Sequence, residues 1–209
     1  MFFNKLKIYL LLIIFCAASS SLACYAVEPK QDAITKKYDF TLEEEQEIGF
    51  RAALVLIKKY GYYKNPLVNQ YINSVGENIA GKVSKRPDIK YRFIVLNTSE
   101  VNAFAEPGGF IMVTKGTLSV IDNEAELAGL LGHEIAHIEE GHGLQSLTLD
   151  PNMKDKLRMI RIYLDSGEGL SQRNMNLFDE DLKKNRGTSN TVNFDSAINS
   201  DNFKKGKIF

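Results

Sequence analysis

The sequence predicts an α+β fold that is mainly helical and contains a small, mostly antiparallel sheet. Two long stretches with helical apolar spacing come first, at 41–60 and 65–83. Three short runs rich in β-branched and aromatic residues follow between 91 and 114, and a further apolar helical stretch begins near 122. At 209 residues and 44% apolar content, the chain is long enough for one domain with an ordinary core.

The first 26 residues have the composition of an export signal and are excluded from the predicted fold. Two lysines precede an apolar run from 8 to 18, and small residues follow it. The run is too short for an ordinary membrane span. Three interpretations stay open: cleavage after Ala26, a loosely matching lipobox in which Cys24 becomes the lipidated first residue, or an uncleaved anchor. Each predicts export to the periplasm or cell envelope, with membrane attachment through Cys24 in the second.

Cysteine usage and charge exclude several classes of protein. Both cysteines, Cys16 and Cys24, lie in the signal segment, so the domain has no disulfide framework and no cysteine nucleophile or metal ligand. The 26 basic and 26 acidic residues balance each other. No global charge therefore favours nucleic acid as a partner, and none is expected.

The first two helices are marked by the residues at their ends. A capping box of Thr41 and Glu44 begins the first helix, and Gly61 ends it. Pro66 stands at the first position of the second helix, where its missing N–H is tolerated. The buried stripe of this second helix is predicted from apolar residues that recur every four positions, namely Leu67, Tyr71, Val75, Ile79 and Val83.

The sheet and the later helices complete the predicted domain. Pro107-Gly108-Gly109 supplies a turn between two of the three strands, which are expected at 91–96, 101–105 and 110–114. Asp122 is the expected N-cap of the next helix, and a last helix is expected over 172–184. The chain is thereby divided into a signal segment (1–26), a polar linker (27–40), one domain (41–185) and a polar, loosely ordered tail (186–209).

The helix that begins near 122 contains the pattern H-E-x-x-H, as His133-Glu134-Ile135-Ala136-His137. Residues four apart lie on one face of a helix, so His133 and His137 can direct imidazole nitrogens at a single metal ion. Glu134 is placed to take a proton from a metal-bound water. Zinc is expected, because two imidazoles, a carboxylate and an open water position make the usual hydrolytic zinc site. The pattern therefore predicts a zinc-dependent peptidase with one Zn2+ per chain.

A five-residue pattern also occurs by chance, with histidines that serve only packing. Here, all three histidines of the chain lie within ten residues, on an apolar helix where buried polar groups need a partner such as a metal. His142 follows His137 by five positions, whereas the metzincin pattern requires six. We therefore expect His142 to support the site, cap the helix end or line the cleft, and not to bind the metal.

The wider pattern resembles the M48 family of zinc metalloendopeptidases over roughly residues 42–147. The resemblance rests on an N-A-F-x-x-P-G-G segment upstream of H-E-x-x-H, and on further matching segments at 71–76, 114–116 and 123–128. It implies a compact gluzincin-like domain that acts on polypeptides, namely misfolded or envelope proteins. It also implies that a strand borders the substrate cleft and binds extended chains by backbone hydrogen bonds. The implied cleft residues are Asn102, Ala103, Phe104, Pro107, Gly108 and Gly109.

The chain departs from this family at the third zinc ligand, which the resemblance implies is a glutamate on a later helix. In the similar stretch at 171–179, Met175 stands at the ligand position, and a thioether is a poor zinc ligand. Another carboxylate then takes the role, or the site is weak or inactive; the candidates are Glu168, Glu180 and Asp179. The main prediction is an active zinc metalloendopeptidase, and the alternative is a catalytically inactive or truncated relative that binds protein substrates without cleaving them.

Overall fold

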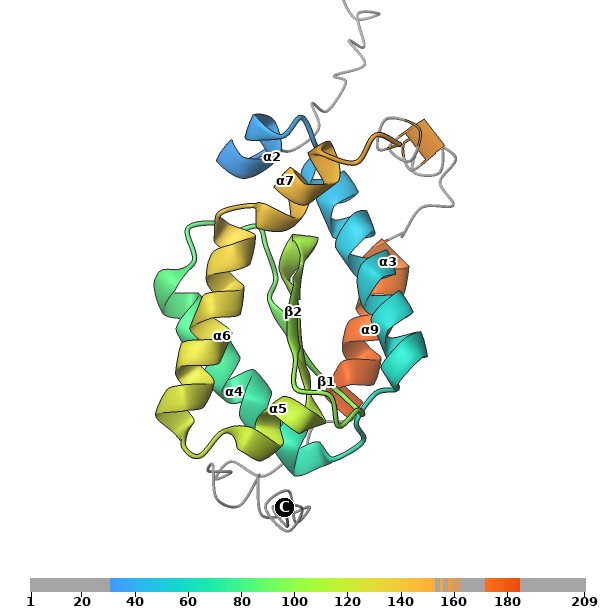
Figure 1. Ribbon diagram of the computed structural model, residues 1–209. Helices are drawn as coiled ribbons and strands as arrows, with labels where there is room; N and C mark the ends of the chain where they lie inside the picture. The colour runs from blue at the N-terminus through green and yellow to red at the C-terminus, as the bar shows by residue number, and fades with distance from the viewer. Residues whose placement is uncertain (1–30, 153–154, 156–157, 160, 162–171, 185–209) are drawn as a thin grey trace, which may run out of the picture.

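Helices cover both faces of a small sheet (Figure 1). The computed structural model describes residues 31–152 and 172–184, together with positions 155, 158, 159 and 161. The predicted signal segment, including Cys24, and the predicted tail lie outside the described residues. Within the described part of the chain, none of the helices is both long and apolar enough to cross a membrane.

The elements follow one another as helices, then strands, then helices. The first part contains α2 (Ala33–Lys37), α3 (Leu42–Tyr60) and α4 (Pro66–Val83). The strands are β1 (Arg92–Leu96), β2 (Ala103–Glu106) and β3 (Phe110–Thr114), with the 3-10 turn η1 (Pro107–Gly109) between the last two. The later helices are α5 (Lys115–Val120), α6 (Glu124–Glu139), α7 (His142–Thr148) and α9 (Gln172–Lys184).

The predicted ends of α3 and α4 are confirmed. Thr41 Oγ1 accepts a hydrogen bond from the Glu44 N–H at 3.1 Å, and the Glu44 carboxylate accepts one from the Thr41 N–H at 2.7 Å. Gly61 ends α3 with φ 80°, in the left-handed region that favours glycine. Pro66 is the first residue of α4, and Asn65 caps that helix. The last helix, predicted over 172–184, is confirmed as α9.

The buried face of α4 differs from the predicted stripe. Leu67 and Val83, at the two ends of that stripe, are 36% and 50% exposed, whereas Val68 and Ile72 are fully buried. A helix has 3.6 residues per turn, so a strict spacing of four advances about 40° too far at each step. The predicted stripe therefore rotates out of the core toward both of its ends: Tyr71 is buried, and Val75 and Ile79 are partly buried.

The start of α6 also differs by one residue from the prediction. Asn123, and not Asp122, is the N-cap: its Oδ1 accepts a hydrogen bond from the Glu126 N–H at 3.0 Å. The Glu126 carboxylate accepts in return from the Asp122 N–H at 2.9 Å. This reciprocal pair fixes the first turn of the helix that carries the histidines.

The expected linker contributes to the packed structure. Residues 33–37 form the helix α2, and the Asp32 carboxylate caps it by accepting from the N–H groups of Ile34 and Thr35 at 3.0 and 2.9 Å. The same carboxylate accepts a hydrogen bond from Arg86 Nε at 2.5 Å. The chain is therefore attached to the domain from about residue 32.

The sheet is mixed, and not mostly antiparallel as predicted. Its strand order is β1-β3-β2, in which β1 and β3 are parallel and β2 and β3 are antiparallel. After the loop 97–102, β2 does not pair with β1. It forms an edge of the sheet, and β3 then lies between β1 and β2. A parallel pair results because β1 and β3 then run in the same direction.

The sheet separates two apolar clusters. Phe93, Val95, Ile111 and Val113 belong to the cluster that includes the buried residues of α4 and α6. The alternate positions, Ile94, Leu96, Phe110 and Met112, pack with residues of α3 and with Leu182 and Phe178 of α9. Figure 1 shows the same division, with α4 and α6 on one side of the strands and α3 and α9 on the other.

Candidate active site

The two motif histidines converge on the surface of α6. His133 Nε2 and His137 Nε2 are 3.0 Å apart, and the ring centroids are 4.6 Å apart. Two zinc–imidazole bonds of about 2.0–2.1 Å that meet at a tetrahedral angle separate their nitrogens by about 3.3 Å. The observed pair is close to that geometry. The donor set present on α6 therefore fits two ligands of one zinc ion.

Glu134 lies beside this pair and is buried, with 8% of its surface exposed. Burial raises the pKa of its carboxyl group above the ordinary value, although the neighbouring charges of His137 and His133 oppose this effect. A carboxylate with a raised pKa accepts and holds a proton more readily near neutral pH. The structure thus places a buried carboxylate beside the two imidazoles.

His142 approaches His137 from the side away from His133. Gly141, with φ 70°, separates α6 from α7 and turns the chain back toward the motif. His142 Nδ1 consequently lies 2.9 Å from His137 Nδ1, so that one ring nitrogen donates and the other accepts. The contact uses the nitrogen of His137 that does not face His133. This position agrees with a supporting role for His142, which stays a prediction.

The strand expected to border the substrate cleft is the edge strand of the sheet. Among the described strands, β2 pairs only with β3, and all four of its residues are partly exposed. Ala103 and Ala105 pack with the α6 side, whereas Phe104 faces α3, with its ring centroid 6.1 Å from that of Tyr60. Asn102 precedes the strand and is exposed. Small side chains thus face the histidine helix along an unpaired strand edge.

The P-G-G part of the expected cleft is buried and packs against α3. Gly108 and Gly109 have φ values of 72° and 94°, a conformation that other residues rarely adopt. A Cβ atom on Gly49 of α3 would lie 1.7 Å from the Pro107 carbonyl oxygen. The turn therefore fixes the end of β2 against α3 by backbone contact, while Ala103 and its neighbours in the strand are the accessible part.

A buried ion pair behind the site was not predicted. Arg86 and Glu45 have side chains that are 4% and 1% exposed, and Arg86 Nη2 lies 2.5 Å from Glu45 Oε2. Burial alone would lower the pKa of Arg86, but the carboxylates of Glu45 and Asp32 raise it above its ordinary value. The guanidinium is therefore charged at all relevant pH values. The available signal was an arginine directly before Pro87, which sequence reasoning treated only as a break between elements.

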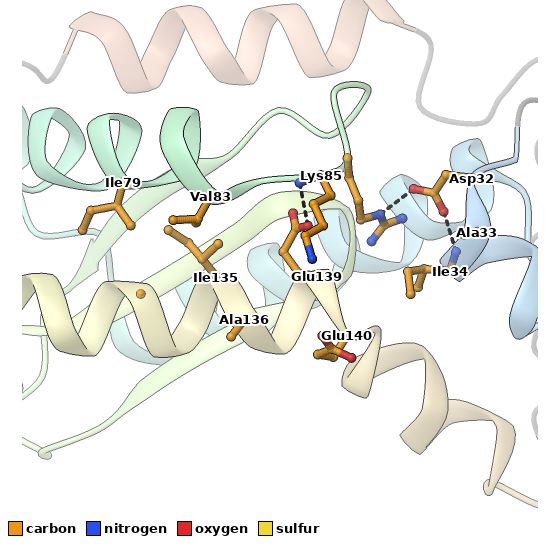
Figure 2. Close-up of a pocket in the computed structure, with 12 residues that line it drawn as sticks. Asp32, Ala33, Ile34, Ile79, Val83, Lys85, Ile135, Ala136, Glu139 and Glu140 are labelled. Carbon is orange, nitrogen blue, oxygen red and sulfur yellow. Dashed lines mark hydrogen bonds and ion pairs between the residues drawn. The ribbon is translucent and has the colours of Figure 1, made fainter.

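A separate hollow of about 430 Å³ is lined by residues of α2, α4 and α6. Figure 2 shows its apolar wall, which includes Ile79, Val83 and Ile135, and its polar end near Asp32 and Glu139. The lining residues of α6 do not include the motif histidines or Glu134. The hollow is therefore distinct from the candidate active site.

Asp179, one of the candidate third ligands, forms ion pairs with Arg92 and Lys90 on the other face of the sheet. Its Oδ1 accepts from Arg92 Nε at 2.6 Å, and its Oδ2 accepts from Lys90 Nζ at 2.5 Å. Burial alone would raise the pKa of Asp179, but these hydrogen bonds hold it below its usual value. The structure thus places Asp179 in an ion pair that docks α9, and does not bring it to the histidines.

The other candidates leave the third ligand undetermined within the described residues. Across that part of the chain, no group of three or more His, Cys, Asp or Glu residues is arranged to hold a metal. Glu180 lies on α9 and is exposed. Glu168 and the side chain of Met175 lie outside the described residues. The pair on α6 is the part of the predicted zinc site that the structure assembles.

Comparison with known proteins identifies the class to which this fold and site belong. Residues 66–178, more than half of the chain, match the family model described as Peptidase family M48. The chain therefore belongs to peptidase family M48, and the predicted resemblance is confirmed.

Several curated relatives are named as proteases. The beta-barrel assembly-enhancing protease of Escherichia coli (strain K12) is 38% identical over 80 residues, which make up 37% of this chain and 16% of the relative. Metalloprotease YcaL of the same organism is 30% identical over 131 residues, or 63% of this chain and 46% of the relative. The mitochondrial metalloendopeptidase OMA1 of Arabidopsis thaliana is 37% identical over 60 residues, or 29% of this chain and 12% of the relative. The chain spans less than half the length of each.

Proposed function

We propose that this chain is a zinc-dependent metalloendopeptidase that cleaves polypeptides in the periplasm or cell envelope. One observation carries the proposal: two imidazole nitrogens converge within 3.0 Å beside a buried glutamate, in a member of peptidase family M48. The export signal read from the sequence and the name of the beta-barrel assembly-enhancing protease support the compartment.

His133 and His137 would hold the zinc ion through their Nε2 atoms. A hydrogen bond between His137 Nδ1 and His142 Nδ1 leaves Nε2 of His137 available and restrains the orientation of its ring. Asp179 is already engaged by Arg92, so Glu168 and Glu180 are the remaining candidates for the third ligand. Each is tested by replacement with Gln, and the change that removes the ligand is expected to lower the zinc content of the purified protein below one per chain.

The chemistry follows from the position of Glu134. Zinc, when bound, lowers the pKa of a coordinated water to about 7 and polarises a substrate carbonyl. The Glu134 carboxylate takes a proton from the attacking water and passes it to the leaving amine. Its burial beside the two histidines limits its contact with bulk water and favours this role.

The substrate in this proposal is an extended polypeptide that adds to the unpaired edge of β2. Backbone hydrogen bonds supply the affinity in such strand addition, so the sequence of the bound chain matters little. Ala103 and Ala105 are partly exposed and pack toward α6, so this part of the edge presents small side chains to the substrate. Misfolded or unassembled proteins offer extended segments, and folded domains do not.

The proposal is tested with Glu134→Gln, which removes the base and conserves the shape of the side chain. We expect the variant to lose casein cleavage while it keeps its zinc and its folding transition. Glu140→Gln is the matched control, because Glu140 is an exposed glutamate at the end of the same helix. A Glu134→Gln protein that cleaves casein at the wild-type rate would refute the mechanism. A wild-type protein with one zinc per chain that binds casein without cleaving it would establish the non-cleaving alternative.

A further inference from the structure

A continuous chain of hydrogen bonds connects the histidine helix to the turn that ends the edge strand. Arg86 Nη1 donates to the carbonyl oxygen of Ile138 at 3.1 Å and to Glu45 Oε1 at 3.0 Å. The same oxygen of Glu45 accepts from the Gly108 N–H at 3.1 Å. Ile138 directly follows His137, and Gly108 lies two residues after the last residue of β2.

The side chains of Arg86 and Glu45 are suited to fix the end of α6 relative to the turn at Gly108, and not merely to fill space. Both are almost completely buried, so the pair is weakly screened by water or salt. Arg86 Nη1 and Nη2 contact both oxygens of Glu45, and this paired contact fixes the relative orientation of the two groups. The carbonyl of Ile138 belongs to the last turn of α6, where it accepts from the Gly141 N–H at 3.1 Å as well as from Arg86. Arg86 therefore holds the end of the motif helix directly.

We propose that Arg86 and Glu45 are positioning residues that set the distance between the metal-binding histidines and the strand edge that holds the substrate. This inference rests on the proposed peptidase function. The scissile bond must meet the attacking group in near-attack geometry, and a displacement of about 1 Å can lower the rate by about 10²-fold. Each side chain acts through the backbone that it holds, at Ile138 for Arg86 and at Gly108 for Glu45.

The chain offers a matched control on the opposite face of the sheet. Arg92 is also 4% exposed and binds a carboxylate through two nitrogens, with Nε 2.6 Å from Asp179 Oδ1 and Nη2 3.2 Å from Oδ2. It holds α9 and lies 4.8 Å from the ring centroid of Phe110, and its hydrogen bonds reach neither α6 nor Gly108. Replacing either arginine with lysine removes a buried planar donor and keeps the charge. The two changes therefore differ mainly in which elements they release.

The first measurement compares the kinetics of the zinc-loaded full chain with casein as substrate. For Arg86→Lys we expect kcat to fall at least tenfold with KM changed less than threefold, because the bound chain is held but misplaced. For Arg92→Lys we expect kcat within twofold of wild type, even if its melting temperature falls by as much as that of Arg86→Lys. Equal loss of kcat in both variants, or an unchanged kcat in folded Arg86→Lys, would show that the pair is only structural.

A second variant keeps the test decisive if Arg86→Lys does not fold. Glu45→Gln retains an oxygen that can accept from the Gly108 N–H, but it removes the charge that orients Arg86. We expect at least a threefold loss of kcat with zinc content still at one per chain. Wild-type kcat in this variant would overturn the role of Glu45.

The third measurement does not depend on activity and separates the two proposals. Amide hydrogen exchange should increase in Arg86→Lys over both 103–109 and 133–141, whereas Arg92→Lys should increase it over 172–184. Unchanged exchange in either of the first two segments would overturn the inference. If the zinc-loaded wild-type protein fails to cleave casein, the proposed function fails, and this exchange pattern still decides whether Arg86 couples the two elements.

Discussion

Replacing Asp179 with Asn distinguishes a structural carboxylate from a zinc ligand. The side chains of Asp179 and Arg92 are 10% and 5% exposed, so the substitution leaves a buried guanidinium without its counter-charge. Breaking a buried pair in this way costs about 3–5 kcal/mol, and the retained amide oxygen favours the lower end. Lys90 is 56% exposed and adds less than about 1 kcal/mol. We therefore expect the free energy of unfolding to fall by about 3 kcal/mol.

The pH dependence of stability provides an internal check on the same substitution. Because the folded pKa of Asp179 is held below its unfolded value, the ion pair contributes fully above the unfolded pKa of about 3.9. The contribution is lost as pH falls through the lower, folded pKa. The difference between the wild type and Asp179→Asn should thus be largest near neutral pH and should shrink as the pH drops below about 4.

Urea unfolding from pH 3 to 7, together with the zinc content of the purified proteins, provides the assay. A loss of about 3 kcal/mol corresponds to a decrease in melting temperature of about 6–12 °C for a domain of this size. Zinc content should stay equal to that of the wild type, because Asp179 lies across the sheet from the histidines. A variant that loses its zinc but keeps its stability would refute this reasoning and would make Asp179 a ligand.

Three further predictions concern the packing around α6 and the turn behind the edge strand. Gly49→Ala should lower the free energy of unfolding by more than about 2 kcal/mol, because its Cβ would lie 1.7 Å from the Pro107 oxygen; urea unfolding measures this. Gly129 lies in an exposed part of α6, and a Cβ atom added there would have nothing within 4 Å. Gly129→Ala should therefore stabilise the protein by about 0.5–1 kcal/mol in the same assay. A loss of stability would contradict the described helix. Leu131→Ala removes a fully buried side chain and should cost about 3–5 kcal/mol, whereas a loss below 1 kcal/mol would show that the core is not packed as described.

Local features of the fold were predictable because the interactions that produce them are close in sequence. The capping box of Thr41 and Glu44 requires residues only three positions apart, and the helix that it begins was predicted with its end at Gly61. The histidine pair on α6 follows in the same way from one helical turn. The strand order could not be obtained by such reasoning, because the β1–β3 pair joins segments that are eighteen residues apart in register, Arg92 with Phe110.

The missing part of the site prediction concerns charged residues whose partners are distant. Glu45 stands in a run of acidic residues at the start of α3, where a favourable helix dipole already explains a glutamate. Its partner Arg86 is 41 residues away, so neither residue alone indicated a buried pair. Asp179 was considered as a ligand because its position in a motif was known, but the position of α9 relative to the sheet was not. Tertiary packing decides all of these roles.

The short length of β2 limits what its free edge can do. Exposed strand edges are the usual starting points for aggregation, and proteins restrict this hazard by keeping such strands short. Here the edge has four residues and ends at a turn in which Gly108 is pressed against α3. Only a few backbone hydrogen bonds can form along it, so a captured chain is expected to dissociate readily, and a second copy of the protein has too little strand to extend into a continuous sheet.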